Sequence, residues 1–185
     1  MCKRQNLKEG KSVLLIPENS IGRKTKFSSH FWNPIMFVWN PLIVGTLIAD
    51  KHPAFDDFPT ANYADWQWWD ILNYGTALEI NNLKNITPII QSIDSYETNR
   101  KLGLAFEANV DAGKLFVLSV DPGKDIDKRP AMSQLLNSVK KYVASGNFKP
   151  VDSLYSYELD AIFHNPAVED QKTPADAATR QLLNQ

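Results

Sequence analysis

The sequence has too few cysteines and histidines for the common metal and disulfide sites. Its single cysteine, Cys2, cannot form an internal disulfide, and a structural zinc site needs about four ligands. The three histidines, His30, His52 and His164, are scattered without the spacing of metal ligands. We therefore expect no metal site. We also expect Cys2 to lie on a terminus without regular structure, which argues against its use as a nucleophile.

Glycine is scarce as well, with 8 residues, and the patterns that bind phosphate are absent. The chain contains neither G-x-G-x-x-G nor G-x-x-x-x-G-K-[ST], and it lacks the G-x-S-x-G turn that presents a nucleophilic serine. The sequence therefore predicts no nucleotide cofactor, and we expect no cofactor of any kind.

The chain also lacks an excess of charge of either sign and a long apolar segment. Its formal net charge is −1, which gives no basic field for nucleic acid or for an anionic membrane surface. The longest apolar stretch, residues 34–49, is broken by Asn40, Pro41 and Gly45 and is too short to span a bilayer. No apolar run follows the basic N-terminus, so we expect a cytoplasmic protein. A fragment of a secreted protein would instead be periplasmic or extracellular.

What the chain does have is an ordinary globular composition, with 43% hydrophobic and 22% charged residues. Apolar runs bounded by turn residues predict buried strands, and the spacing i, i+3, i+4, i+7 predicts an amphipathic helix. The expected strands are residues 11–17, 44–48, 77–80, 88–93, 102–110 and 114–120, the last two joined as a hairpin. The expected helices are residues 65–74, 129–144 and 154–163. This alternation predicts a three-layer α/β domain over residues 1–168, followed by a polar tail, residues 169–185, that begins like a short helix.

The tryptophans are the most unusual feature of the composition. Trp66, Trp68 and Trp69 lie within four positions, and Trp32 and Trp39 precede them. In a helix, Trp66 and Trp69 share one face whereas Trp68 points elsewhere. Exposed indole rings would suit stacking on sugar rings, and buried rings would form part of a core or an interface. The pattern leaves both interpretations open, with at least one ring expected in the core.

Carboxylates are candidate catalytic groups, because glycosidases use two of them. The candidates in apolar surroundings are Asp50, Asp70, Glu79, Asp94, Glu107 and Asp121. Asp121 follows a predicted buried strand, where ligands bind in α/β sheets, but it could equally cap the turn or pair with Arg129 or Lys128. Arg100 belongs either to a polar site beside a strand or to a solvated loop with local ion pairs.

An ordered series of motifs extends over most of the chain and resembles a C-terminal region of bacterial glycoside hydrolase family 2 proteins of the β-galactosidase-like kind. The motifs are F-W-N-P at 31–34, H-P-A-F at 52–55, F-P-T at 58–60, D-W-Q-W-W at 65–69, P-I-I-Q-S-I-D at 88–94, N-R-K-L-G-L-A-F-E-A at 99–108, G-K-L at 113–115 and D-K-R-P at 127–130.

The resemblance implies a flavodoxin-like domain of the class I glutamine-amidotransferase-like type. Its sheet would be mostly parallel with an antiparallel hairpin at one edge, and it would lack the amidotransferase cysteine. Such a region lies outside the catalytic barrel, so no catalytic residue is carried over. The strand at 12–16 resembles the middle of such a domain. We therefore expect a domain that is incomplete at its N-terminus, with an open sheet edge available for self-association.

Three functions follow, in decreasing order of support. The first is a non-catalytic accessory domain of a glycosidase, bracing its catalytic domain or contacting carbohydrate through Trp66, Trp68, Trp69, Arg100 and Asp121. The second is a protein–protein assembly module that uses apolar surface around residues 31–39. The third is a stand-alone hydrolase, which would require Glu107 and Asp121 to face each other across about 5 to 9 Å.

Overall fold

A computed structural model describes residues 2–17, 23–24, 43–94, 98–123 and 125–164. The helices are α1 (Cys2–Lys8), α2 (Trp68–Asn73), α3 (Pro130–Ala144) and α4 (Ser156–His164), with the 3₁₀ turns η1 (Pro53–Phe55) and η2 (Ile126–Lys128). The strands are β1 (Ser12–Leu15), β2 (Arg23–Lys24), β3 (Ile43–Ile48), β4 (Thr76–Glu79), β5 (Ile90–Asp94), β6 (Lys101–Val110), β7 (Gly113–Leu118) and β8 (Ser153–Leu154).

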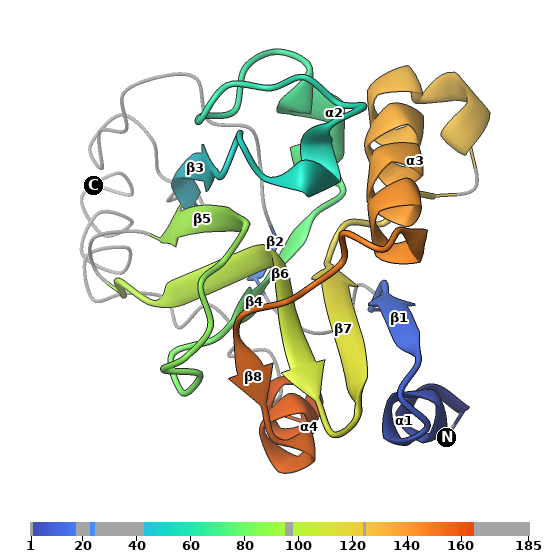
Figure 1. The fold of residues 1–185 in the computed structure, drawn as a ribbon. Helices are drawn as coiled ribbons and strands as arrows, with labels where there is room; N and C mark the ends of the chain where they lie inside the picture. The colour runs from blue at the N-terminus through green and yellow to red at the C-terminus, as the bar shows by residue number, and fades with distance from the viewer. Residues whose placement is uncertain (1, 18–22, 25–42, 95–97, 124, 165–185) are drawn as a thin grey trace, which may run out of the picture.

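The eight strands of the described residues join into one mixed sheet around β6 (Figure 1). Strand β6 is antiparallel to β4, β5 and β7 and parallel to β8. The pairs β2–β4 and β3–β5 are also antiparallel, and β1 runs parallel to β7. Five of these seven pairings are therefore antiparallel.

The predicted flavodoxin-like three-layer sandwich with a mostly parallel sheet is wrong, because the sheet is mostly antiparallel and the described residues form few helices. The apolar runs in β6 and β7 do not reflect parallel pairing. Both strands are buried on their two faces by helices and loops, and a strand buried on both faces is apolar whatever the direction of its neighbours.

Burial on both faces produces two hydrophobic clusters. Along β7, Phe116 and Leu118 belong to the cluster formed with α2, α3 and η1. Leu115 and Val117, which alternate with them, belong to the cluster formed with α1 and α4. Figure 1 shows α2 and α3 side by side at one end of the molecule, with α1 and α4 at the other.

The β6–β7 hairpin is closed by the predicted turn, where Asp111 has a φ of 53°. Gly113 follows it in tight contact with the main chain that leaves α1. A Cβ atom at Gly113 would lie 2.6 Å from the carbonyl oxygen of Leu7 and 2.7 Å from that of Lys11. No side chain fits at this position. A glycine is therefore required for the hairpin to pack against the N-terminal segment.

The long predicted helix is confirmed as α3, with Pro130 in its first turn and its apolar stripe buried. Helix α2 begins at Trp68, three residues later than predicted, because the Asp65 carboxylate accepts the backbone N–H of Gln67 in the preceding turn. The N-terminus was predicted to lack regular structure, but Cys2–Lys8 form α1.

Two predicted segments, residues 31–39 and the tail 169–185, lie outside the described residues. None of the described helices has the length and apolar character needed to cross a membrane.

Candidate functional site

Trp68 occupies the core and is not available to a ligand. Its side chain is fully buried, and its indole N–H donates to the Thr60 hydroxyl at 2.8 Å. The rings of Phe55 and Phe58 pack edge-on against it, with centroids at 6.2 and 5.3 Å. This tryptophan therefore anchors α2 to η1.

Trp66 and Trp69 have the opposite environment, with 75% and 53% of their surfaces exposed. The chain enters α2 through two consecutive i to i+3 turns, in which Trp68 N–H donates to the Asp65 carbonyl and Trp69 N–H to the Trp66 carbonyl. Residues i and i+3 of such turns lie one above the other. The sequence-based expectation that Trp66 and Trp69 share a face distinct from that of Trp68 is consistent with this geometry.

Arg129, whose surface is only 9% exposed, contacts both ends of α2: Asp70 in its first turn and Tyr74 at its C-cap. Its Nε donates to the Asp70 carboxylate at 2.7 Å, and its Nη1 donates to the carbonyl oxygens of Asp121 and Pro122, both at 2.9 Å. The guanidinium also lies 4.2 Å from the centre of the Tyr74 ring, and Tyr74 is 51% exposed. This stacked cation orients the exposed Tyr74 ring, which caps the C-terminal end of α2.

Asp121 lies at the C-terminal end of α2, because the segment that leaves β7 pairs with the segment that leaves α2. Its backbone N–H donates to the Tyr74 carbonyl at 3.0 Å, and its carboxylate accepts the Gly123 N–H at 2.7 Å. The Asp121 carboxylate therefore caps its own turn, which is one of the alternatives that the sequence left open for it. Arg129 binds the backbone of Asp121 and forms its ion pair with Asp70, a partner that the sequence offers no way to single out.

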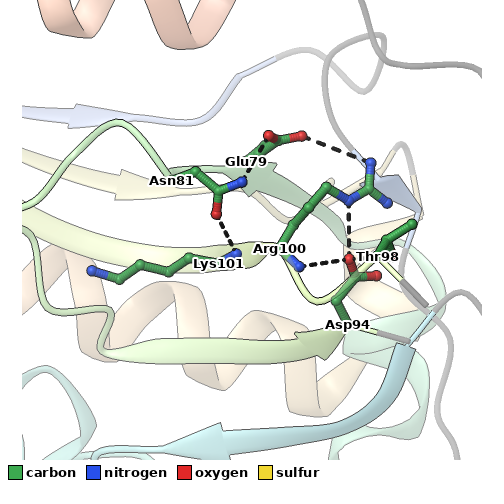
Figure 2. Close-up of polar contacts among 6 residues, drawn as sticks. All are labelled: Glu79, Asn81, Asp94, Thr98, Arg100 and Lys101. Carbon is green, nitrogen blue, oxygen red and sulfur yellow. Dashed lines mark hydrogen bonds and ion pairs between the residues drawn. The ribbon is translucent and has the colours of Figure 1, made fainter. Parts of the chain in front are cut away.

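Arg100 lies elsewhere, at the turn between β5 and β6 (Figure 2). Its Nε donates to the Asp94 carboxylate at 2.9 Å, and its Nη1 lies 3.7 Å from the Glu79 carboxylate. The Asp94 side chain is fully buried and also accepts the Arg100 N–H at 3.0 Å and the Thr98 hydroxyl at 2.6 Å. Arg100 is thus part of a buried structural pair and does not join the tryptophans through any of these contacts.

Glu107 and Asp121 are not brought face to face. Glu107 pairs in register with Phe116, five residues before Asp121, which corresponds to roughly 16 Å along an extended strand. Its carboxylate instead accepts the Tyr142 hydroxyl at 3.2 Å and lies 3.7 Å from His52 Nε2. Burial, reinforced by the Glu107 charge, raises the pKa of Tyr142, so this hydroxyl remains a hydrogen-bond donor.

Within the described ranges, no group of three or more histidine, cysteine, aspartate or glutamate side chains is arranged to hold a metal. Among the described residues, Trp66 and Trp69 are the exposed indole rings, and they lie on one turn beside the buried Trp68. We call these two residues the α2 aromatic surface. It offers flat apolar rings to a binding partner.

Comparison with known proteins gives a family but no activity. A family model described as a domain of unknown function (DUF8487) matches residues 2–164. No curated protein matches the chain.

Proposed function

This chain belongs to the DUF8487 family, and we propose that it is a non-catalytic, carbohydrate-associated module that binds sugar rings on the α2 aromatic surface. The observation that carries the proposal is the exposure of Trp66 and Trp69 on one turn, beside a third tryptophan that is fully buried. Indole rings are normally buried. Two exposed indole rings on a turn that the buried Trp68 anchors therefore indicate a binding surface.

The chemistry of the surface suits a sugar. The flat faces of indole rings stack on the C–H faces of a pyranose, and polar neighbours accept its hydroxyl protons. Asp70 is a half-buried carboxylate within the same helix as Trp69 and adjacent to it in sequence, with 27% of its side chain exposed. The resemblance of the sequence motifs to β-galactosidase-like proteins is the ground for placing this module within a glycoside hydrolase.

Tryptophan fluorescence tests the proposal directly. Titration with galactose and lactose should produce a saturable change at millimolar sugar, and Trp66→Ala and Trp69→Ala should each weaken that response. Tyr63→Ala is the matched control, because Tyr63 is 60% exposed but lies outside the α2 aromatic surface. A response that survives both tryptophan substitutions, or its absence with every sugar tried, would contradict a carbohydrate role for this surface.

A second function, protein assembly, is favoured by a different observation. Leu47, Tyr63 and Ile93 are 51%, 60% and 38% exposed. Leu47 pairs with Tyr63, and Gly45, two residues before Leu47, pairs with Ile93, so the three side chains share one face of the β3–β5 pair. Sedimentation over a range of concentrations tests this alternative: Leu47→Asp should abolish any self-association, and a wild-type protein that stays monomeric throughout would oppose it.

A further inference from the structure

A small pocket lies on the α4 side of the molecule, away from the α2 aromatic surface. It has a volume of about 180 Å³ and lies between the end of β4 and the first turns of α4. Leu83 and Ile162, which are 3% and 7% exposed, form its apolar floor. That volume lies below the roughly 300–1,000 Å³ of typical pockets for drug-sized ligands, so the pocket can take only a small molecule.

One wall of this α4 pocket is aromatic. Tyr157 lines it and is 68% exposed. Its ring stacks on that of Tyr155, with the centroids 5.5 Å apart and the planes inclined by 10°. The stack fixes the orientation of the Tyr157 ring before any ligand arrives, which lowers the entropic cost of binding against it.

The polar lining of the pocket is acidic. Glu79 and Glu158 contribute carboxylates and Asn82 contributes an amide, and no cationic side chain is among the described residues that line it. The Glu158 carboxylate is held at the start of α4 by the Tyr155 N–H at 2.9 Å. Both carboxylates are therefore oriented by contacts within the protein.

Glu79 is only partly neutralised. Figure 2 shows its carboxylate between the amide of Asn81, which donates at 3.0 Å, and Arg100, whose Nη1 lies 3.7 Å away. Arg100 makes its shorter contact, 2.9 Å, with Asp94. One arginine is thus shared between two carboxylates, and Glu158 adds a third negative charge on the opposite wall. The pocket consequently favours a cation.

We propose that the α4 pocket binds a small hydroxylated ammonium compound, of which an amino sugar is the representative. The ammonium group would lie between Glu79 and Glu158, the hydroxyl groups would face the Asn82 amide, and the carbon skeleton would rest on Tyr157 and the apolar floor. Aromatic faces and carboxylates together are the groups that attract such a cation. This site is separate from the α2 aromatic surface and does not depend on the function proposed for it.

Nuclear magnetic resonance titration tests the site with D-glucosamine as the probe, D-glucose as its uncharged counterpart and constant ionic strength. Glucosamine should shift the backbone amides of residues 79–83 and 156–162 saturably in the millimolar range, and glucose should not. Equal shifts with glucose would overturn the ammonium specificity. The absence of saturable shifts with glucosamine would overturn the site itself.

Substitutions then identify the groups responsible. Glu158→Gln retains an acceptor for the Tyr155 N–H, so α4 should stay folded while the dissociation constant of glucosamine rises by up to about fivefold. Tyr157→Leu should weaken binding as well, with the rest of the spectrum unchanged. Asp127→Asn, an exposed change in η2, is the matched loss of one charge and should have no effect. Equal weakening by Glu158→Gln and Asp127→Asn would contradict a specific contact.

The proposals for the α4 pocket and for the α2 aromatic surface can be rejected independently of each other. Trp66→Ala should leave the glucosamine shifts at the α4 pocket intact, and Glu158→Gln should leave the fluorescence response of the α2 aromatic surface to galactose intact. Loss of one response without the other therefore rejects only the corresponding site.

Discussion

Two regions of this protein are each organised around an arginine and a carboxylate, yet they differ in which partner is buried. At the β5–β6 turn the carboxylate is buried, because the Asp94 side chain has no exposed surface whereas that of Arg100 is 16% exposed. At α2 the arginine is the more buried partner, because the side chain of Arg129 is 9% exposed and that of Asp70 is 27% exposed.

The difference indicates what each pair does. Asp94 accepts hydrogen bonds from the side chains of Thr98 and Arg100 and from the Arg100 backbone, so its pair closes a turn. Arg129 contacts Asp70, two carbonyl oxygens of the segment after β7 and the Tyr74 ring, so its pair joins α2 to that segment. A similar ion pair therefore serves local closure in one region and long-range support in the other.

The largest effect is expected within the α2 region itself. Trp68→Ala removes a fully buried indole and should lower the free energy of unfolding by about 3–5 kcal/mol. Urea denaturation monitored by circular dichroism measures it. A loss below about 1 kcal/mol would contradict the anchoring role of Trp68.

The next largest effect tests the β5–β6 turn. Asp94→Ala leaves Arg100 without its closest charged partner and should lower the free energy of unfolding by about 3 kcal/mol. Removing one member of a buried pair leaves the charge of the other uncompensated. The same denaturation experiment measures it. Asp127→Asn, an exposed change, is the control and should stay within about 0.5 kcal/mol of wild type.

The corresponding change at α2 should be milder. Asp70→Ala removes the carboxylate from Arg129, but the guanidinium keeps its three backbone carbonyl acceptors and the Tyr74 ring. We expect a loss of about 1–2 kcal/mol, because Asp70 is partly solvated. If Asp70→Ala proved as costly as Asp94→Ala, the distinction between the two pairs would fail.

A third polar contact, outside both regions, has a pH signature. The pKa of Tyr142 is raised above its ordinary value of 10.0, mainly by burial. Above about pH 10 the unfolded chain releases the tyrosine proton while the folded protein retains it, so stability should fall as pH rises. Tyr142→Phe should cost about 1 kcal/mol at neutral pH and remove this alkaline slope. If the melting temperature of Tyr142→Phe fell with pH from 9 to 11 as steeply as that of the wild type, the role of Tyr142 would be contradicted.

The smallest effect on stability is expected at the exposed tryptophans. Trp66→Ala should change the free energy of unfolding by less than about 0.5 kcal/mol, because three quarters of its surface is already in water. Combined with a weakened galactose response, this result would separate binding from folding. A loss comparable to that of Trp68→Ala would show that Trp66 supports the fold instead.

Much of the local structure could be predicted from the sequence, because it depends on near neighbours. The strands β6 and β7, their hairpin and α3 were all predicted from alternation, turn residues and helical spacing. Strand partners are a different matter. The sequence carries no direct sign that β1 would lie beside β7 or that β8 would join β6, and the apolar runs wrongly suggested a parallel sheet.

The candidate site divides in the same way. The opposed faces of Trp66 and Trp68 follow from their spacing, so the sequence could predict them. The pairing of Arg129 with Asp70 spans 59 positions and has no local signal. For Arg100 the sequence left open a polar site beside a strand or a solvated loop. The pairing of Arg100 with a fully buried Asp94 depends on how the ends of β5 and β6 meet.

The position of β1 also has a consequence for the order in which the protein can fold during synthesis. Its described strand partner is β7, roughly one hundred positions further along the chain, and Gly113 contacts the segment that joins α1 to β1. A ribosome releases the N-terminus first, so α1 and β1 emerge long before the hairpin that receives them. The apolar side chains of Leu7 and Val13 therefore cannot pack against β7 until that strand has been synthesised.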